Sequence, residues 1–391
     1  MIILLYVVFI SLGLPDALLG TAWPVMQTEF GVIISYMSIL SIIVSLGTIT
    51  SSLYSDMITK KFGVGKVIAA SVLLSAISIF GYSLAESFWM MCIISIPYGL
   101  AAGAIDAAVN NFVALHYKSA QMSWLHCFWG VGISISPYIM RFAFINTDNH
   151  VTGYKVGYGI VALIQIAIFI IVWLALPAFK KMVVKSDIPE VRENGEQKGS
   201  VETFKIRELL KIKGVKLILV AFFCYCGIEM MVGAWASSYF VNAKGISVEV
   251  AAKFTSYFFI GITGGRFVSG FIANKLGDRR MIMLGETLML IGCLMLFFDA
   301  TTLIGLLVIG IGCAPVYPSI IHSTPDNFGK KYSQAIIGLE MAGAYTGSLI
   351  MPAIFGALAG LIGVQIYPIY ALVLAILLIV STVIFHKNVK A

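Results

Sequence analysis

Four acidic residues stand out inside long apolar stretches of this sequence: Asp16, Asp106, Glu229 and Glu340. A charged side chain at the centre of a bilayer costs roughly 2.5–3.5 kcal/mol on insertion scales, so a buried acid needs a partner or a use. One intramembrane cation, Arg266, stands out, near the cytoplasmic end of its stretch, and one cation cannot neutralise four acids. Burial favours the neutral form of a carboxyl group. A carboxyl group that is neutral when enclosed and charged when exposed can carry a proton.

The neighbours of Asp106 and Asp16 strengthen this interpretation. Asp106 shares one helical face with Gly99, Gly103 and Asn110, at spacings of three or four residues. Such a face combines close helix packing with a polar patch. Asp16 follows a proline, which weakens local backbone hydrogen bonding, and precedes Gly20 and Trp23 on its own face. We predict proton coupling through Asp16 and Asp106.

Aromatic and polar side chains accompany the acids. His126 and Trp129 share one stretch, and Tyr225 lies one turn before Glu229. Carboxylates and amides bind hydroxyl groups, and aromatic rings stack on the apolar face of a sugar ring. The predicted solute contacts are Asp16, Trp23, Asp106, Asn110, His126, Trp129, Tyr225, Glu229 and Glu340. Packing or anchoring at the membrane interface remains the alternative for the aromatic residues.

The composition defines the class of protein. Hydrophobic residues make up 59% of the 391 residues, charged residues 12%, and the mean hydropathy is +0.95. Soluble domains have roughly a quarter of their residues charged, so this chain cannot cover a water-facing surface. The sequence has no zinc-ligand spacing and no basic stripe interleaved with aromatics, which disfavours nucleic-acid binding. The six cysteines fall in apolar runs and are expected to pack, and we expect no metal or cofactor.

Twelve apolar stretches are long enough to cross a bilayer, which takes about 20 residues. We therefore expect an all-α membrane protein with an N-terminal six-helix bundle (1–178), a cytoplasmic linker (179–213) with a short amphipathic helix near 202–213, and a C-terminal six-helix bundle (214–391). The N-terminus begins in an apolar run without a basic region, so we interpret it as the first span and not as a signal peptide. The stretches are 1–27, 33–56, 66–84, 88–115, 124–145, 156–178, 215–242, 250–274, 281–298, 302–322, 333–361 and 365–386.

The distribution of basic residues predicts the orientation. With a cytoplasmic N-terminus, 21 of the 26 Lys and Arg residues fall in cytoplasmic segments, ten of them between Lys180 and Lys216. Cytoplasmic loops carry an excess of Lys and Arg. We therefore expect a multi-pass protein of the cell membrane with both termini in the cytoplasm.

The two halves share a motif after their second span. The segment "SDMITKKFGVGK" in the first half and "GRFVSGFIANKLGDRR" in the second each end an apolar helix with a basic turn around a glycine. The second copy resembles the loop motif of the major facilitator superfamily, G-x-x-x-D-(R/K)-x-G-x-(R/K)-(R/K), but has an asparagine in place of the acid. Such a turn can cap helix ends and pair with an acid in one conformation only. The residues predicted for this role are Asp56, Arg266, Gly270, Asn274, Lys275, Gly277, Arg279 and Arg280.

Six segments together are similar to the fucose–galactose–proton symporter family of that superfamily. They occur in the family's order across both halves: "GLPDALLGTAWP", "GLAAGAIDAAVNNFVALHY", "LHCFWGVG", "CGIEMMVGAW", "GRFVSGFI" and "GCAPVYPSI". The resemblance implies the major facilitator fold of two pseudo-symmetric six-helix bundles, with a solute site near the membrane midplane reached by alternating access.

The resemblance also implies roles for single residues. Asp16 matches the family's acid in the first span, and Asp106 with Asn110 matches the acid and amide of the fourth span, where the family usually has Glu. The implied role of this acid pair is proton coupling and contact with the sugar. Glu229 matches an acid common in the seventh span, whereas Glu340 has no counterpart. His126 replaces the Asn and Gln contacts common in the fifth span, which leaves the sugar unidentified.

The predicted function is proton-coupled symport of a small polar solute, a monosaccharide in the first instance, by a monomer that needs no protein partner. A proton-coupled exporter of drugs or metabolites with the same fold is the alternative. Its glycine-rich Gly-Pro motif is absent from the fifth span, which has Gly130, Gly132 and Pro137. A membrane-embedded enzyme would need clustered acids or a nucleophile with its base. A solute sensor would need an output domain, and an ATP-driven pump would need a phosphate loop.

Overall fold

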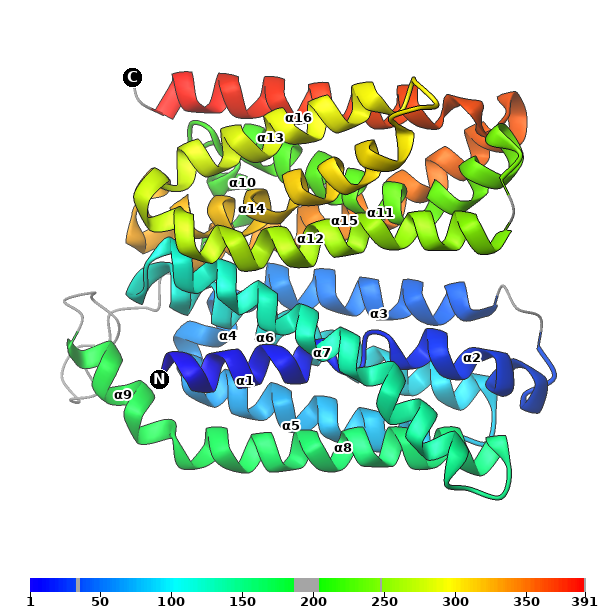
Figure 1. The fold of residues 1–391 in the computed structure, drawn as a ribbon. Coiled ribbons are helices and arrows are strands. Elements are labelled where there is room, and N and C mark those ends of the chain that lie inside the picture. Colours follow the sequence, from blue (N-terminus) through cyan, green and yellow to red (C-terminus); the bar gives the residue numbers. More distant parts are fainter. Residues whose placement is uncertain (33–35, 186–203, 247, 390–391) are drawn as a thin grey trace. The chain divides into compact units, whose positions relative to one another are not determined.

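The computed structural model describes residues 1–32, 36–185, 204–246 and 248–389, and these residues form helices without strands (Figure 1). The chain divides into two compact units. Unit 1 comprises Met1–Phe112 and Leu125–Thr203, and unit 2 comprises Val113–Trp124 and Phe204–Ala391. The short segment Val113–Trp124 therefore packs with unit 2, although the chain on both sides of it belongs to unit 1.

Unit 1 consists of a broken first span followed by long helices. Pro15, which has no backbone N–H, lies in the break of the first span. Two short helices extend the bundle at its basic end: one directly precedes the helix Val64–Ser83, and the other directly follows the helix His150–Leu174. The helices are α1 (Ile2–Gly13), α2 (Leu18–Glu29), α3 (Tyr36–Leu53), α4 (Ser55–Phe62), α5 (Val64–Ser83), α6 (Phe88–His116), α7 (Ser119–Ile145), α8 (His150–Leu174) and α9 (Leu176–Lys185).

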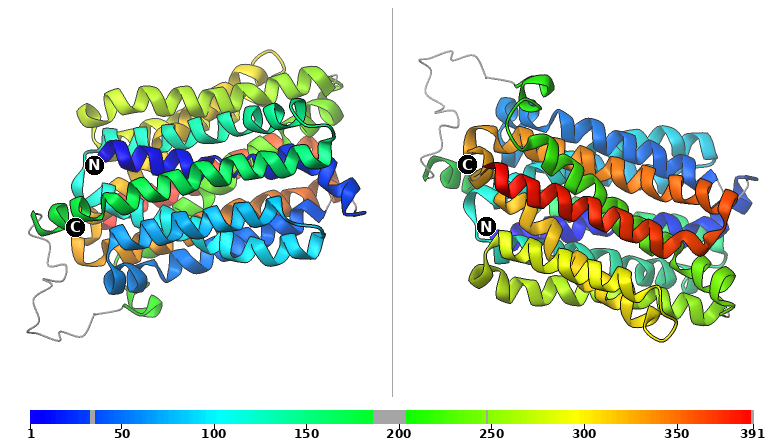
Figure 2. Two further views of the ribbon diagram at one scale, coloured as in Figure 1. Left: turned by 90° about the horizontal axis from the view of Figure 1, so that it is seen from below. Right: turned by 90° about the horizontal axis from the view of Figure 1, so that it is seen from above.

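Unit 2 repeats this plan with an unbroken first helix. Its first long helix packs mainly on the last two, and its fourth packs on the second and third. Both views of Figure 2 show the long helices within each unit running along a common direction. The helices are α10 (Ile206–Leu209), α11 (Val215–Lys244), α12 (Val248–Leu276), α13 (Asp278–Met295), α14 (Thr302–Phe328), α15 (Lys330–Ile362), the 3-10 turn η1 (Val364–Ile366) and α16 (Tyr367–Val389).

The twelve predicted spans correspond, within the described residues, to the pair α1–α2 and eleven further long helices. Ten of these are long and apolar enough to cross a membrane by length and composition, and α12 and α13 are the other two. Charged residues explain the case of α13, which carries two acids and two arginines in 18 residues. The chain is an all-α, multi-pass membrane protein.

Some boundaries differ from the prediction. The turn expected after the second span is instead the helix α4, and α7 begins at Ser119, five residues earlier than expected. Residues 179–185 of the predicted linker are helical and belong to α9, whereas residues 186–203 lie outside the described part of the chain. The predicted amphipathic helix is reduced to the four residues of α10, and its first two positions, 202 and 203, are not described.

Glycines allow the same pairs of helices to touch in both units. In unit 1, a Cβ atom on Gly132 of α7 would overlap the backbone of α1, and one on Gly99 of α6 would overlap that of α3. In unit 2, Gly347 of α15 meets α11 and Gly310 of α14 meets α12 in the same way. These are the first-with-fifth and second-with-fourth spans of each half. Backbones approach closely only where small residues line the contact, so the sequence repeat is also a packing repeat.

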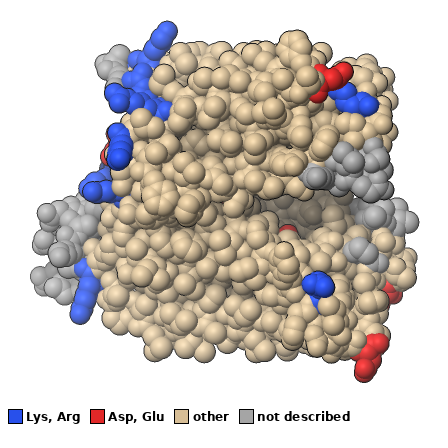
Figure 3. Space-filling view, in the orientation of Figure 1, with Lys and Arg blue, Asp and Glu red and all other residues tan. Residues whose placement is uncertain are grey.

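Charged side chains mark the ends of each unit. On the face shown in Figure 3, most Lys and Arg side chains gather at one end of each unit, the left end in this view. This is the end that carries the α4–α5 and α12–α13 turns (Figure 1). At the opposite ends, Lys155 pairs with Glu29 at 3.3 Å in unit 1, and Lys244 pairs with Asp299 in unit 2. The apolar surface between the two ends is suited to lipid.

Replacing Gly347 by Ala should destabilise unit 2, because the added methyl group would overlap the carbonyl oxygen of Phe223 on α11. Overpacking of this kind costs about 1–3 kcal/mol. Gly360→Ala in the same helix is the matched control, since a methyl group there meets nothing within 4 Å. Thermal unfolding of the purified protein should show a lower transition temperature for Gly347→Ala only; equal transitions in both variants would contradict the packing account.

Candidate functional site

Asp16 lies in the break between α1 and α2, where its exposed carboxylate receives two hydrogen bonds. The indole Nε1 of Trp129 on α7 donates to Oδ2 at 2.9 Å, and the hydroxyl of Tyr98 on α6 donates to Oδ1 at 3.3 Å. Interrupting the helix turns this carboxylate away from regular packing. Unit 1 thus holds an accessible acid between one amphipathic aromatic side chain and one buried tyrosine.

A second polar group in unit 1 is a buried row of three side chains. Asn110 Nδ2 donates to Asp106 Oδ1 at 2.7 Å, and Asn110 Oδ1 lies 3.1 Å from His126 Nε2. Because the Asn110 oxygen can only accept, His126 carries its proton on Nε2 in this arrangement. All three side chains are at most 5% exposed, and the ring of Phe9 packs edge-on against His126 at 5.4 Å. The spacing that predicted a polar patch has produced a hydrogen-bonded row.

The exposed acid and the buried row both lie in unit 1 and share helix α7. Trp129, which binds Asp16, lies three residues after His126, which binds Asn110, so the two side chains are one helical turn apart. Five predicted residues, Asp16, Asp106, Asn110, His126 and Trp129, meet in this way, and they are called the unit 1 acid site below.

Trp23 does not join this site. Its side chain is 2% exposed and packs in the core of unit 1, with the ring of Phe88 edge-on at 6.4 Å. The prediction that Trp23 contacts solute is therefore corrected to a packing role. The physical reason is that α2 turns this face toward α6 and α8, where a large apolar ring fills the core.

Glu229 and Arg266 form an ion pair inside unit 2. Arg266 Nη2 donates to Glu229 Oε1 at 3.1 Å, and the side chains are 6% and 17% exposed. Glu229 is central in α11, and Arg266 lies ten residues before the end of α12, or about 15 Å of helix. The prediction that placed Arg266 near the end of its span, with the basic turn, is wrong: the guanidinium is in the interior, where Glu229 compensates its charge.

Tyr225 and Glu340 are enclosed in unit 2. Tyr225 is 0% exposed and its hydroxyl donates to the carbonyl oxygen of Cys313 on α14 at 2.9 Å. Glu340 is also 0% exposed and contacts the hydroxyl of Thr324. Neither side chain is open to a solute in this structure, which corrects the prediction of direct contact in this conformation.

The motif turn of unit 2 holds the beginning of α7. Asn274 Oδ1 accepts the backbone N–H of Ala120 at 3.1 Å, and Asp278 Oδ1 accepts the hydroxyl of Ser119 at 2.5 Å. The first N–H groups of a helix are unsatisfied and carry partial positive charge, so acceptors stabilise this end. Gly277, with φ of +75°, makes the sharp reversal between α12 and α13 that presents both acceptors.

Gly270 contributes space to the same contact. A Cβ atom at this position would overlap the indole of Trp124, whose ring packs edge-on against Phe271 at 5.6 Å. Lys275, Arg279 and Arg280 are exposed and contribute charge to the basic end of the unit. The motif therefore acts here through its glycines and acceptors on segment Val113–Trp124.

The first copy of the motif is arranged differently. Asp56 is buried in α4 and pairs with Lys60 at 2.9 Å within the same helix. Burial raises the pKa of Asp56 above its usual range, and the hydrogen bond and charge of Lys60 act in the opposite direction. Among the described residues, the second carboxylate oxygen of Asp56 has no hydrogen-bond partner.

Three residues at these sites were not predicted. Tyr98 binds Asp16, and Asp278 is joined to His322, whose Nδ1 lies 2.6 Å from Asp278 Oδ2 and whose Nε2 lies 2.9 Å from the carbonyl oxygen of Tyr117. Asp278 occupies a variable position of the motif directly after Gly277, so the motif itself gave no reason to select it. His322 could have been selected from the sequence, because it is a histidine at the end of an apolar stretch and lies four residues before an acid, Asp326.

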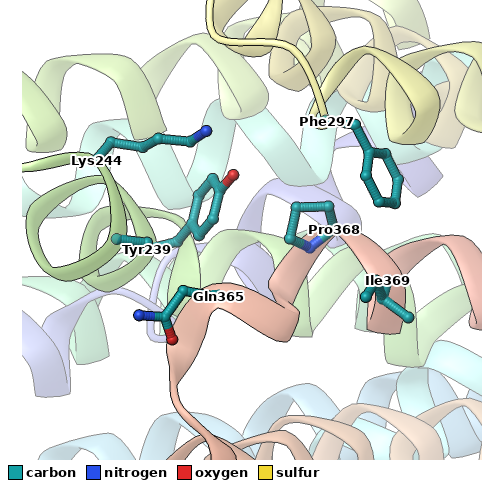
Figure 4. A pocket seen from close by; sticks show the side chains of 7 residues that line it. Tyr239, Lys244, Phe297, Gln365, Pro368 and Ile369 are labelled. Carbon is teal, nitrogen blue, oxygen red and sulfur yellow. The ribbon is translucent and has the colours of Figure 1, made fainter.

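One pocket in unit 2 does not belong to the predicted site. A pocket of about 260 Å³ in unit 2 is lined by Tyr239, Lys244, Phe297 and Gln365, among others, and contains none of the predicted site residues (Figure 4). No group of three or more His, Cys, Asp or Glu residues in the described ranges could hold a metal ion.

Comparison with protein families decides the class. The family model of the Major Facilitator Superfamily matches residues 5–298 and 217–390. The chain belongs to the Major Facilitator Superfamily. This result confirms the predicted superfamily. The family and the fold of this chain are those of transporters.

Relatives in this superfamily are distant and span most of the chain. "Bypass of stop codon protein 6" of Saccharomyces cerevisiae is 20% identical over 98% of this chain and 82% of its own length. The glucose/mannose transporter GlcP of Bacillus subtilis is 21% identical over 90% of this chain and 86% of its own length.

Solved structures of the superfamily share the fold. FucP in its outward conformation superposes with a TM-score of 0.77 at 15% identity, over 99% of this chain and 98% of that chain. The proton:xylose symporter XylE gives 0.76 at 13% identity, over 99% and 94%. These matches confirm the major facilitator fold.

Asn274→Leu should accelerate amide hydrogen exchange at Ala120 about fivefold, because losing one hydrogen bond of roughly 1 kcal/mol frees the first turn of α7. Asp278→Asn should have a smaller effect on the same turn, since an amide oxygen still accepts from Ser119. Arg280→Gln is the control, because that side chain is exposed. Exchange mass spectrometry of the peptide containing Ala120 measures the change; unaltered exchange in Asn274→Leu would contradict the capping role.

Proposed function

We propose that this protein is a proton-coupled symporter of a monosaccharide. The observation that carries the proposal is the unit 1 acid site, where the accessible carboxylate of Asp16 is held by Trp129 and Tyr98. One turn before Trp129 on α7, His126 joins the Asp106–Asn110 pair. Carboxylates, an amide and an indole ring together match the hydroxyl groups and the apolar face of a sugar. Asp16, Asp106, Asn110, His126 and Trp129 are the proposed solute and proton contacts.

Coupling follows from the cost of enclosing charge. An occluded state that surrounds Asp16 with low-dielectric material disfavours its carboxylate, and a proton removes that cost. A bound sugar favours closure by satisfying the polar groups that closure would otherwise leave unpaired. Proton and sugar each favour the same conformational step, which is the requirement for coupled movement. The buried Asp106–Asn110–His126 row offers the second place where a proton can reside.

The names of several relatives support a sugar as the solute and leave the coupling ion to be tested. They include a glucose/mannose transporter and a hexuronate transporter from Bacillus subtilis, and a sodium-dependent glucose transporter from mouse. The two solved symporters are named for fucose and xylose with protons. We favour the proton because the site offers carboxyl groups that can change charge.

We further propose that the protein works as a monomer in the cell membrane, with both termini cytoplasmic. Within each unit, the basic residues of one turn support this orientation, since positive residues stay on the cytoplasmic side: Lys60 and Lys61 before the α4–α5 turn in unit 1, and Lys275 before the α12–α13 turn in unit 2. The twofold plan of six-helix halves encloses a solute path within one chain in this fold.

The proposed coupling predicts that Asp16→Asn and Asp106→Asn abolish concentrative uptake. In proteoliposomes, radiolabelled glucose, mannose, galactose and fucose are each tested under an inward proton gradient and under an inward sodium gradient. The wild type should accumulate one of them with protons, whereas both variants should equilibrate to a ratio of roughly one, because a neutral amide cannot bind and release the proton. Asp148→Asn, an exposed acid, is the control. Full proton-driven accumulation in both variants, or accumulation driven by sodium alone, would disprove the assignment.

Trp129→Phe should lower the apparent affinity for the same sugar about tenfold. The phenyl ring preserves stacking but removes the N–H that holds Asp16, and a hydrogen bond to a charged group contributes about 1.5–3 kcal/mol. Trp173→Phe, at a side chain that is 57% exposed, is the matched control. Initial uptake rates against sugar concentration give the comparison, and equal half-saturation in the two variants would exclude a positioning role for the indole.

A further inference from the structure

Glu340 is a fully buried acid that the proposed transport cycle does not use. It lies on α15, ten residues from the start of the helix, and is 0% exposed. Its contacts are with one hydroxyl group on α14: Thr324 Oγ1 lies 3.0 Å from Oε1 and 2.9 Å from Oε2. Thr324 is itself 1% exposed, so the pair is closed off from solvent within unit 2.

The neutral form of Glu340 satisfies the hydrogen-bonding groups of this pair better than the ionised form does. Thr324 Oγ1 lies 3.1 Å from the carbonyl oxygen of Ile320 as well as near both Glu340 oxygens, but a hydroxyl has a single hydrogen to donate. If Glu340 is protonated, its O–H donates to Thr324 and Thr324 donates to Ile320, so both hydrogens are used. If Glu340 is ionised, one hydroxyl must serve three acceptors, and a full charge is buried with one hydrogen bond.

No cation compensates this acid among the residues that the structure describes. Within these residues, Glu340 is hydrogen-bonded to the Thr324 hydroxyl, and none of the ion pairs found there includes it. An isolated buried charge costs several kcal/mol, which greatly exceeds one hydrogen bond. The acidic, basic and histidine side chains on the elements that pack against α15 are Lys216, Glu229 and Lys244 on α11, Arg207 and Glu208 on α10, His322 and Asp326 on α14, and His386 and Lys387 on α16.

The helix around Thr324 is locally weak. Pro325 follows it and has no N–H, so the carbonyl of Ile321 loses its helical partner in this turn. The helix ends three residues later, at Phe328. On α15, buried Ser333 lies two turns before Glu340 on the same face. Opening of this last turn of α14 would therefore expose Glu340 through a polar path at the basic end of unit 2.

We propose that Glu340 and Thr324 form a proton-binding site in unit 2 that is separate from the unit 1 acid site. Glu340 holds a proton in the packed arrangement seen here and releases it when the last turn of α14 opens to water. The site binds a proton and nothing larger, since the pair is enclosed. It exists whether or not transport is coupled through Asp16 and Asp106.

Infrared difference spectroscopy of the protein in membranes, titrated from acidic to alkaline pH without any sugar, tests the site. Protonated carboxyl groups have a C=O stretching band that ionised ones lack. The wild type should show a component that disappears as pH rises, and Glu340→Gln should lose this component. The double variant Asp16→Asn, Asp106→Asn should retain it, which separates this proposal from the proposed coupling. Glu86→Gln, at an exposed acid, is the control.

The hydroxyl partner has its own test in the same spectra. Thr324→Val should shift the Glu340 component to higher wavenumber, because the carboxyl O–H loses its acceptor, whereas Thr324→Ser should leave it in place. Glu340→Gln should fold as the wild type does, since its amide N–H donates to Thr324 as the neutral acid does. Failure of this variant to fold, spectra identical to the wild type, a component that does not titrate, or its loss in the double variant would each overturn the proposal.

Discussion

The structure depends on one constraint: a polar group inside a bilayer must find its partner within the protein, because no water is there to replace it. Three acids of this chain meet it in three different ways. Asp16 keeps an exposed carboxylate and takes two hydrogen bonds from aromatic side chains. Glu229 is compensated by a guanidinium, and Glu340 is held by a hydroxyl that suits its neutral form. Each solution leaves a different capacity to change charge.

Irregular backbone provides the places where these solutions occur. Asp16 is accessible because the first span is interrupted around Pro15, and Thr324 lies directly before a proline in the last turn of α14. Glycines have no side chain, so helix pairs such as α11 and α15 can meet backbone to backbone. Asp16 and the Thr324–Glu340 pair therefore both lie beside an interruption of regular helix.

The turn between α12 and α13 shows how a motif can keep its task with altered residues. The expected acid is replaced by Asn274, which still accepts a backbone N–H at the start of α7. A carboxylate is supplied four residues later by Asp278, which binds Ser119 and His322. The requirement is an acceptor at the positive end of a helix, and either an amide or a carboxylate oxygen can meet it. The contact therefore survives a departure from the pattern.

Hydropathy and charge placement in the sequence determined twelve spans, because crossing a bilayer requires length and low polarity, which are properties of each stretch alone. Helical spacing also sufficed to join Asp106 with Asn110, since both lie on one helix. Partners on different helices were decided only by the tertiary structure: Tyr98 and Trp129 for Asp16, Glu229 for Arg266, and Thr324 for Glu340. Trp23 shows the same limit, because spacing places it on the face of Asp16 whereas packing buries it in the core. Period and composition describe one helix at a time, and which helices meet is fixed by how they pack.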